Sequence, residues 1–461
     1  MPPQVALLLC ICFILVVIAI DTKRKSVVSR ALWIPLLWMM IIGSRFVSQW
    51  LNFSAPVESP DYYLEGSPID RTVFMLLMVV GLFILSRRKI EWSKVMKSNV
   101  WLFLMFFYFG VSILWSDFPV VSLKRWIKAI GDLIMILIVL TESDPAESIK
   151  SLFKRCAYVL IPLSILFIKY YPHLGRTYVS WTGTVVTFTG VATNKNSLGA
   201  LCLVCGLFFF WNLQTMWLKR NINISKKEVF VHVLFLCMIV WLLKLSDSAT
   251  SLATFIIGVC IFIWTELPKV KRNKIHIKIF IVFLILLLLQ ISFDIKNLFI
   301  SILGRETTLT GRTDLWKELI NMGTNPFIGT GYESFWLGSR LKKIWLMDNI
   351  GIVNQAHNGY LEIYLNLGLI GLFFVIGVII TTYKKIGNTL IRDFDFGRFR
   401  LTFLIIFIFY NITENSFRPL SPLWFIFLLI AVKCPQIWQS QNFRENLEIA
   451  AQYSSKKPIM A

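Results

Sequence analysis

The chain has 461 residues, of which 56% are apolar and 16% are charged, with a mean hydropathy of +0.67. Soluble domains are usually about 45–50% apolar and about 25% charged, so this composition excludes an ordinary water-soluble protein and predicts a membrane protein. The 47 Lys and Arg exceed the 26 Asp and Glu by 21, but in a membrane protein such an excess sets the topology, and we expect no nucleic-acid partner.

A helix that crosses the hydrocarbon core needs about 20 mostly apolar residues. The sequence predicts an all-α, polytopic membrane protein with about 11–13 such helices and one long loop on the outer face. The segment 31–51 contains Pro35 and Arg45, and the last two segments are short enough to form a tight pair, which gives the count its range. The candidate segments are 4–20, 31–51, 72–86, 100–116, 126–141, 156–171, 197–217, 229–245, 249–265, 277–293, 358–383, 399–413 and 420–434.

The charged residues predict the orientation of these segments. The first segment has no Lys or Arg before it and no small-residue cleavage site after it, so we expect a retained helix and not a signal peptide. Positive charge concentrates on alternate loops, which the positive-inside rule assigns to the cytoplasm. The N-terminus is then outside and the C-terminus inside. The cytoplasmic parts are the loops 21–30, 87–99, 142–155, 218–228, 266–278 and 384–400 and the tail 435–461.

One connection is much longer than the others, at residues 294–357, and it lies on the predicted outer side of a single membrane domain spanning 1–461. Within it, Leu315, Leu319 and Met322 follow helical spacing, so we expect a short amphipathic helix over 313–322 that ends at Gly323. Long ordered loops are commonly functional. We therefore expect a catalytic loop on the outer face.

The chain has four histidines, and His357 is the best placed for chemistry. It stands where the long loop enters the next membrane helix, and an imidazole there can act as a general base. A histidine that caps the helix or binds a lipid headgroup is the alternative. On the same helix, Glu362 is either a second polar group of the site or an interhelical hydrogen bonder.

Cations on the outer side are the candidates for binding phosphate. Arg312 begins the loop helix, where a guanidinium beside free helix N-terminal amides suits a diphosphate; the alternative is a surface arginine paired with Asp314 or Glu318. Lys195 precedes a helix and could hold a phosphate. Lys128 and Asp132 are four residues apart inside an apolar segment, so we expect mutual neutralisation.

Two further motifs are weak. Asp393 and Asp395 have a spacing used for metals and nucleotide sugars, but their short cytoplasmic loop cannot hold a catalytic domain. Gly329 and Gly331 lack a preceding strand and a third glycine, so they predict a turn and not a dinucleotide site. The outer loops contain no carboxylate cluster that would suggest a metal.

Five stretches taken together carry a family resemblance. They are WSDFP at 115–119, GVATNKNSLG at 190–199, TGRTDLW at 310–316, NPFIGTGY at 325–332 and HNGYLEIYLNLGLIG at 357–371. In this order they resemble the O-antigen ligase and O-antigen polymerase superfamily, and most closely its exopolysaccharide-production polymerases. The block that begins at His357 is the most specific.

The resemblance implies a metal-independent glycosyltransferase without a cofactor, on the outer face of the bacterial inner membrane. Its donor would be a glycan on undecaprenyl diphosphate. The family's essential loop histidine corresponds to His357, its loop arginine corresponds to Arg312, and Asn358 and Glu362 would support the site. A second family cation would fall at 246–250, where this sequence has SDSAT and no Lys or Arg. The candidates to complete the diphosphate site are Lys195, Lys244, Lys124 and Arg125.

These expectations favour a polymerase that joins lipid-linked oligosaccharide repeats into an exopolysaccharide or O-antigen-like chain, by a single displacement that inverts the anomeric carbon. A ligase that transfers the glycan to a different lipid acceptor, and a transporter that moves the lipid-linked unit without chemistry, are the alternatives. Transporters favour charged or broken helices near the membrane midplane. Membrane lipid, chain-length regulators and export proteins are the further candidate partners.

Overall fold

The computed structural model describes residues 1–22, 28–51, 66–178, 185–218, 226–266, 312–347 and 353–434. The predicted membrane helix at 277–293, the first part of the long loop and the tail 435–461 lie outside these residues.

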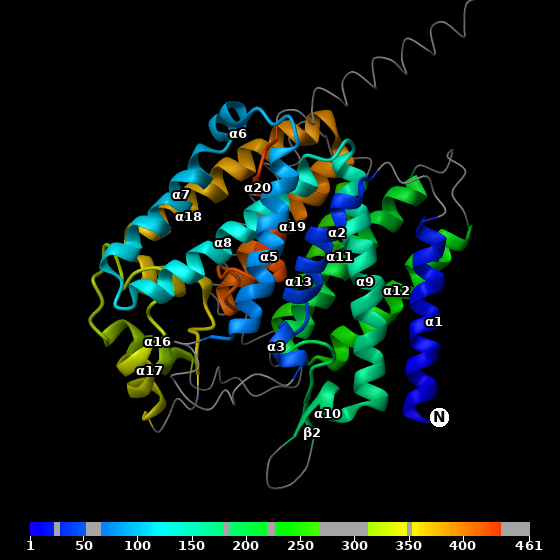
Figure 1. Ribbon diagram of the computed structural model, residues 1–461, viewed down its shortest axis with the longest axis horizontal. Coiled ribbons are helices and arrows are strands. Elements are labelled where there is room, and N and C mark those ends of the chain that lie inside the picture. Colours follow the sequence, from blue (N-terminus) through cyan, green and yellow to red (C-terminus); the bar gives the residue numbers. More distant parts are fainter. Residues whose placement is uncertain are drawn as a thin grey trace, which may run out of the picture.

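The described part of the chain is almost entirely helical (Figure 1). One hairpin interrupts the helices, in which β1 (Arg176–Tyr178) pairs antiparallel with β2 (Val185–Phe188). The helices are α1 (Pro3–Thr22), η1 (Arg30–Leu32), α2 (Trp33–Ile42), α3 (Val47–Trp50), α5 (Pro68–Ser86), α6 (Trp92–Ser98), α7 (Val100–Val111), η2 (Ser112–Trp115), α8 (Pro119–Leu140), α9 (Pro145–Tyr170), α10 (Pro172–Gly175), α11 (Lys195–Leu218), α12 (Lys226–Leu245), α13 (Ala249–Glu266), α16 (Arg312–Asn321), α17 (Gly338–Trp345), α18 (Gly359–Arg392), α19 (Phe394–Thr413) and α20 (Pro422–Ala431).

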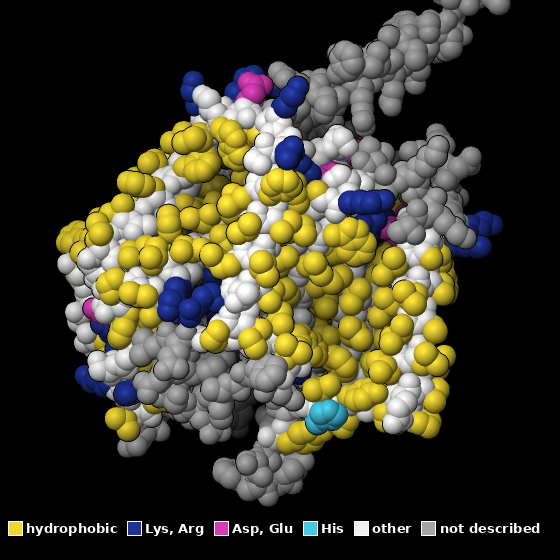
Figure 2. All heavy atoms as spheres, viewed as in Figure 1, with side chains coloured by type: hydrophobic (Ala, Val, Ile, Leu, Met, Phe, Trp, Pro, Cys, Tyr) yellow, Lys and Arg dark blue, Asp and Glu magenta, His cyan; other side chains and the backbone are white. Residues whose placement is uncertain are grey.

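Within the described ranges, 8 helices are long and apolar enough to cross a membrane, or 9 if α6 and α7, which meet at 88°, form one bent span. The segment of α2 and the helix α20 are shorter and also apolar. Every predicted membrane segment other than 277–293 coincides with a helix, so the all-α polytopic fold is confirmed. Figure 2 shows a broad surface of apolar side chains on the face of the bundle in view, as expected for a surface that contacts lipid.

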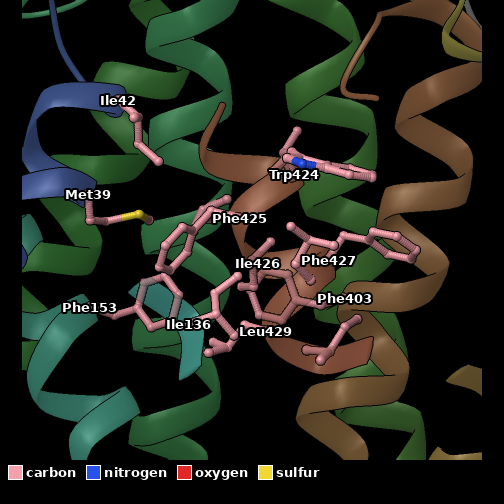
Figure 3. Packing of buried hydrophobic residues seen from close by; sticks show 14 of the residues in the cluster. Met39, Ile42, Ile136, Phe153, Phe403, Trp424, Phe425, Ile426, Phe427 and Leu429 are labelled. Carbon is pink, nitrogen blue, oxygen red and sulfur yellow. The ribbon is translucent and has the colours of Figure 1, made fainter. Parts of the chain in front are cut away.

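The centre of the bundle is the short helix α20, which contacts α8, α11, α18 and α19. All ten of its residues are buried, because a helix that is apolar on every side is stable only when other helices enclose it. Figure 3 shows Phe425 and Ile426 of this helix packed among Phe153 of α9, Ile136 of α8 and Phe403 of α19.

The helix α18 is broken near its start, at Gly368, where φ is 65° and ψ is −164°. The loop 325–331 lies against the break, and the amides of Leu369 and Ile370 donate to the carbonyls of Pro326 and Phe327 at 2.9 and 3.1 Å. These bonds satisfy backbone groups that the break frees from the helical ladder. The predicted turn at Gly329 and Gly331 is confirmed, and it serves as the partner of this broken helix.

The part of the long loop from Arg312 onward has a small apolar core of its own. Leu315 and Leu319 of α16 pack with Leu341 and Ile344 of α17 and with Leu365 of α18. Figure 1 shows α16 and α17 together at one end of the bundle, near the start of α18. The helix expected at 313–322 is confirmed as α16, and its core anchors the loop to the membrane helices.

Two charged motifs have structural partners that their spacing did not predict. Asp132 does not neutralise Lys128: its carboxylate accepts from Trp38 Nε1 at 2.8 Å and from the Leu420 amide at 3.1 Å, so the expected pair is wrong. The side chain of Asp393 caps α19 by accepting from an amide at 3.0 Å, and Asp395 pairs with the buried Arg398 at 3.0 Å. Both aspartates of that motif therefore have structural roles.

Candidate functional site

Glu414 lies at the C-terminal end of α19, and its side chain is only 7% exposed. Its Oε2 atom is 3.1 Å from His357 Nδ1. Its Oε1 atom accepts from an Arg312 Nη2 at 3.2 Å and from Asn196 Nδ2 at 3.0 Å. One buried carboxylate thus joins three residues that come from α11, α16 and the turn before α18.

The turn that carries His357 is fixed from both sides. The carbonyl of Ala356 accepts from Trp316 Nε1 at 2.7 Å, and the amide of Ala356 donates to the Glu362 carboxylate. The second Glu362 oxygen accepts from Trp336 Nε1 at 2.8 Å. Glu362 therefore supports the turn that carries His357.

His357 has a φ of 51°, a left-handed conformation that non-glycine residues seldom adopt. The next residue, Asn358, is the N-cap of α18, and its side-chain oxygen accepts from the amides of Tyr360 and Leu361 at 3.0 Å. The helix-capping role considered for His357 thus belongs to Asn358. The histidine ring is left 25% exposed at the edge of the site.

The contact with Glu414 determines which ring nitrogen of His357 is free. A carboxylate can only accept, so Nδ1 carries the hydrogen and donates to Glu414, and Nε2 presents its lone pair. The side-chain nitrogen of Gln355 also lies 3.3 Å from this Nδ1 atom, but an amide nitrogen cannot accept, so Glu414 is the acceptor for the Nδ1 hydrogen. A base oriented by a carboxylate in this way is suited to taking a proton from a hydroxyl group.

Arg312 pairs across the fold and not within its own helix. In addition to its bond with Glu414, its Nη1 atom donates to the carbonyl of Thr413 at 2.6 Å. The side chain remains 26% exposed. A guanidinium has five N–H donors, and the contacts with described residues use two of them.

Lys195 lies near the C-terminal end of α19, because residues beside it contact that end. Its ammonium contacts Asp247 at 3.4 Å, in the turn between α12 and α13 where the family resemblance placed a second cation. The adjacent Asn196 binds Glu414, and Thr250, in the first turn of α13, bonds Thr413 through the two hydroxyl groups at 2.8 Å. Lys195 therefore brings a positive charge to the turn whose own sequence lacks one.

Among the described residues, the side chains of the other three candidate cations form no hydrogen bond or ion pair with Glu414, His357 or Arg312. Lys244 is exposed in the last turn of α12. Arg125 binds Glu333, through the carbonyl and through the carboxylate at 3.7 Å, and Lys124 precedes it on α8. Arg312 and His357 thus bind the same carboxylate, and Lys195 is linked to it through neighbouring residues. Lys124 and Arg125 lie on a different surface.

Positive φ angles occur at residues that bind several of the side chains discussed above. Within the ranges that the structure describes, the non-glycine residues with positive φ are Asp247, Glu333, His357 and Leu420. Asp247 binds Lys195, Glu333 binds Arg125, and the Leu420 amide binds buried Asp132. Such strain often marks functional sites, because the surrounding contacts must hold it in place.

Sequence reasoning missed Glu414, Asn196 and Asp247. The available signal for Glu414 was a carboxylate at the predicted outer end of a membrane segment, where acidic residues are few. Asn196 lies inside a family-like motif, but its partner is 218 positions away in the chain. Local patterns do not reveal a contact of that range.

Comparison with known proteins gives consistent results. Residues 230–376 match the family described as O-antigen ligase. The chain is 26% identical over 298 residues to the exopolysaccharide production protein ExoQ of Rhizobium meliloti, a match that covers 62% of this chain and 65% of ExoQ. It is also 26% identical over 330 residues to a proposed polysaccharide ligase of Rickettsia typhi, covering 62% of this chain and 79% of that protein. The resemblance expected from the motifs is confirmed.

Proposed function

We propose that this O-antigen ligase-type membrane protein is a polymerase, which joins oligosaccharide repeats carried on undecaprenyl diphosphate into an exopolysaccharide or O-antigen-like chain. The observation that carries the proposal is the pairing of Glu414 with both His357 and Arg312. This arrangement places an oriented base beside a cation that can receive a leaving diphosphate, which is what glycosyl transfer from a lipid diphosphate requires.

The reaction is a single displacement. His357 Nε2 takes the proton from a hydroxyl group of the acceptor sugar, and the hydroxyl oxygen attacks the anomeric carbon of the donor. A new carbon–oxygen bond forms as the bond to the diphosphate breaks, and the electron pair leaves with the lipid diphosphate. Attack opposite the leaving group inverts the anomeric carbon.

Charge on the leaving group is the main electrostatic requirement. Arg312 offers N–H donors to the diphosphate, and Lys195, at the start of α11, adds a second charge beside residues 246–250. The protonated imidazole that forms on His357 is stabilised by Glu414. The same carboxylate holds Arg312, the residue that binds the leaving group. This scheme needs no metal or cofactor to activate a leaving group that is already good.

The site lies at the end of the bundle that the charge distribution assigns to the outside. We accordingly place it on the outer face of the bacterial inner membrane, with the N-terminus outside, the C-terminal tail 435–461 in the cytoplasm and 294–357 as the catalytic loop of one membrane domain. The exposed apolar surface offers a lateral site for a polyprenyl tail (Figure 2). Chain-length regulators and export proteins are the partners that this placement would allow.

Two other functions use the same features differently. A ligase would keep the donor site and accept a different lipid, and the likeness to the Rickettsia typhi protein supports this second candidate. The likeness to ExoQ, whose name refers to exopolysaccharide production, supports the polymerase. A transporter would not need a histidine oriented by a buried carboxylate, so this third reading has less support.

The test is a reaction in detergent with the purified full-length protein and one lipid-linked repeat. Chains that grow in steps of one repeat support the polymerase, and growth should be lost in the His357→Ala variant at an equal amount of folded protein. Transfer that requires an added second lipid acceptor would replace the polymerase by the ligase. Absence of any transfer with either substrate would contradict a glycosyltransferase.

A further inference from the structure

A second group of cations lies on the side of the bundle, where α5 and α8 pack against each other. The two helices run in the same direction, with Met78 of α5 beside Gly131 of α8 and Gly81 beside Ile134, so Arg71 lies at the level of Lys124 and Lys128. Figure 2 shows Lys and Arg side chains gathered within the apolar surface at the place where Figure 1 shows these two helices. We call Arg71, Lys124 and Lys128 the lateral cation cluster.

The nearby carboxylates are already engaged. Asp70, which neighbours the cluster, accepts from the Ser48 amide at 2.9 Å and from the Ser48 hydroxyl at 2.6 Å. Glu333 pairs with Arg125. In the described part of the chain, no carboxylate lies within ion-pair distance of the three side chains of the lateral cation cluster. Asp70 supplies one compensating charge near Lys128, but among the described residues the cations there outnumber the carboxylates, so the cluster keeps a net positive charge.

The surface around the cluster faces lipid rather than water. Arg71 is in the first turn of α5, which is one of the candidate membrane spans. Leu76 of α5 is 60% exposed, and Val120 and Leu123 of α8 are 66% and 43% exposed. Exposed aliphatic side chains on membrane helices contact acyl chains, and like charges beside them are costly unless an anion accompanies them.

We propose that the lateral cation cluster is a binding site for the phosphate group of a membrane lipid. Lys and Arg clustered near the end of a membrane helix attract lipid phosphates, and each such cation adds to the affinity. The exposed aliphatic residues would hold the lipid chains, which a free phosphate ion lacks. The lipid is either an anionic phospholipid or a polyprenyl phosphate, which share this chemistry.

The site is distinct from the group around Glu414, since its members have no contact with His357, Arg312 or Lys195 among the described residues. It is connected to that group through the loop after Gly331. Arg125 binds Glu333, and three residues later Trp336 binds Glu362, which holds the turn of His357. A lipid bound at the cluster would therefore lie beside the loop that supports the candidate active site.

Native mass spectrometry of the full-length protein in detergent tests the proposal, with phosphatidylglycerol, undecaprenyl phosphate and inorganic phosphate as the probes. We expect the Arg71→Gln/Lys128→Gln variant to bind one of the two lipids at least about 10-fold more weakly than the wild type. The matched control is Lys317→Gln/Lys343→Gln, which removes two exposed cations from α16 and α17 and should retain lipid binding.

The lipid whose binding is lost identifies the source of the phosphate. Equal loss in the control, or unchanged lipid binding in the cluster variant, would overturn the proposal. Binding of inorganic phosphate that depends on the cluster, without any lipid binding, would also overturn it. If the double variant does not fold, the single variant of exposed Arg71 supplies the same comparison. Because lipid binding is measured without transfer, the result is independent of the proposed function.

Discussion

The carboxylate of Glu414 lies 3.1 Å from Nδ1 of His357, although 57 positions separate the two residues in the chain. Glu414 ends α19 and His357 precedes α18, and the amide of Gly359 also donates to the Glu414 carbonyl at 3.1 Å. A Cβ atom added to Gly359 would lie 2.1 Å from Asn411 Oδ1, so only glycine permits this close approach. The pair is therefore positioned by the packing of two membrane helices.

The pair predicts a specific loss in Glu414→Gln. The amide keeps the shape of the side chain but cannot stabilise the charged imidazole, so we expect kcat to fall by about 10²–10⁴-fold with a smaller change in KM. Chain growth measured at several substrate concentrations separates the two constants. Glu318→Gln, on the exposed face of α16, is the matched control. A Glu414→Gln enzyme with wild-type kcat would contradict the role of Glu414.

Arg312→Lys keeps the positive charge and removes the planar fork. A lysine cannot hold the Thr413 carbonyl and the Glu414 carboxylate while still presenting donors to a diphosphate. We expect kcat/KM for the lipid-linked donor to fall by about 10–100-fold, the loss typical of one charged hydrogen-bonding group. Retained activity in this variant would make Arg312 a structural residue only.

Lys195 and Lys244 provide a direct comparison of two candidate cations. Lys195 contacts Asp247 in the turn near Glu414, whereas Lys244 is exposed on α12. We expect Lys195→Met to lower kcat/KM by about 10-fold or more and Lys244→Met to leave it close to the wild-type value. Competition by inorganic diphosphate should weaken in the first variant alone. The reverse order of effects would assign the second cation to Lys244.

Gly368→Ala tests the broken helix. An added Cβ would lie 2.2 Å from the backbone of Phe327, and φ at this position is +65°. Gly323→Ala is a matched control, because its φ is +70° but no atom lies within 4 Å of the added Cβ. With a ψ of −164°, Gly368 adopts a conformation that is almost confined to glycine and costs other residues about 1–3 kcal/mol, so Gly368→Ala should lower the free energy of unfolding by at least that amount. Thermal unfolding in detergent compares the two variants, and equal Tm values would contradict the tight contact with the loop.

Much of the fold was predictable because membrane helices are specified by local composition. The apolar segments coincide with helices, and the amphipathic spacing of Leu315 and Leu319 predicted α16. The pairing of polar side chains was less predictable. Lys128 and Asp132 have ideal helical spacing, yet Asp132 binds Trp38 and Leu420, because a buried carboxylate is satisfied by whichever donors the packed helices bring to it.

The candidate site also contains residues that could be predicted from the sequence and residues that could not. His357 and Arg312 could be selected from the sequence, since each lies in a motif, one at the end of the long loop and one at the start of its helix. Glu414 could not, because nothing in its local sequence indicates which residues it meets. The partners of its carboxylate are 57, 102 and 218 positions away.

The sequence by itself determined the membrane class, the segments that form helices and the motif residues of the family, because hydropathy and spacing are local properties of the chain. The tertiary structure decided which cations share a site with His357. It placed Lys124 and Arg125 on a different surface from Lys195, and it brought Glu414 into contact with His357. The physical reason is that a charged side chain between membrane helices needs a partner, and only the packing of distant helices determines which partner it receives.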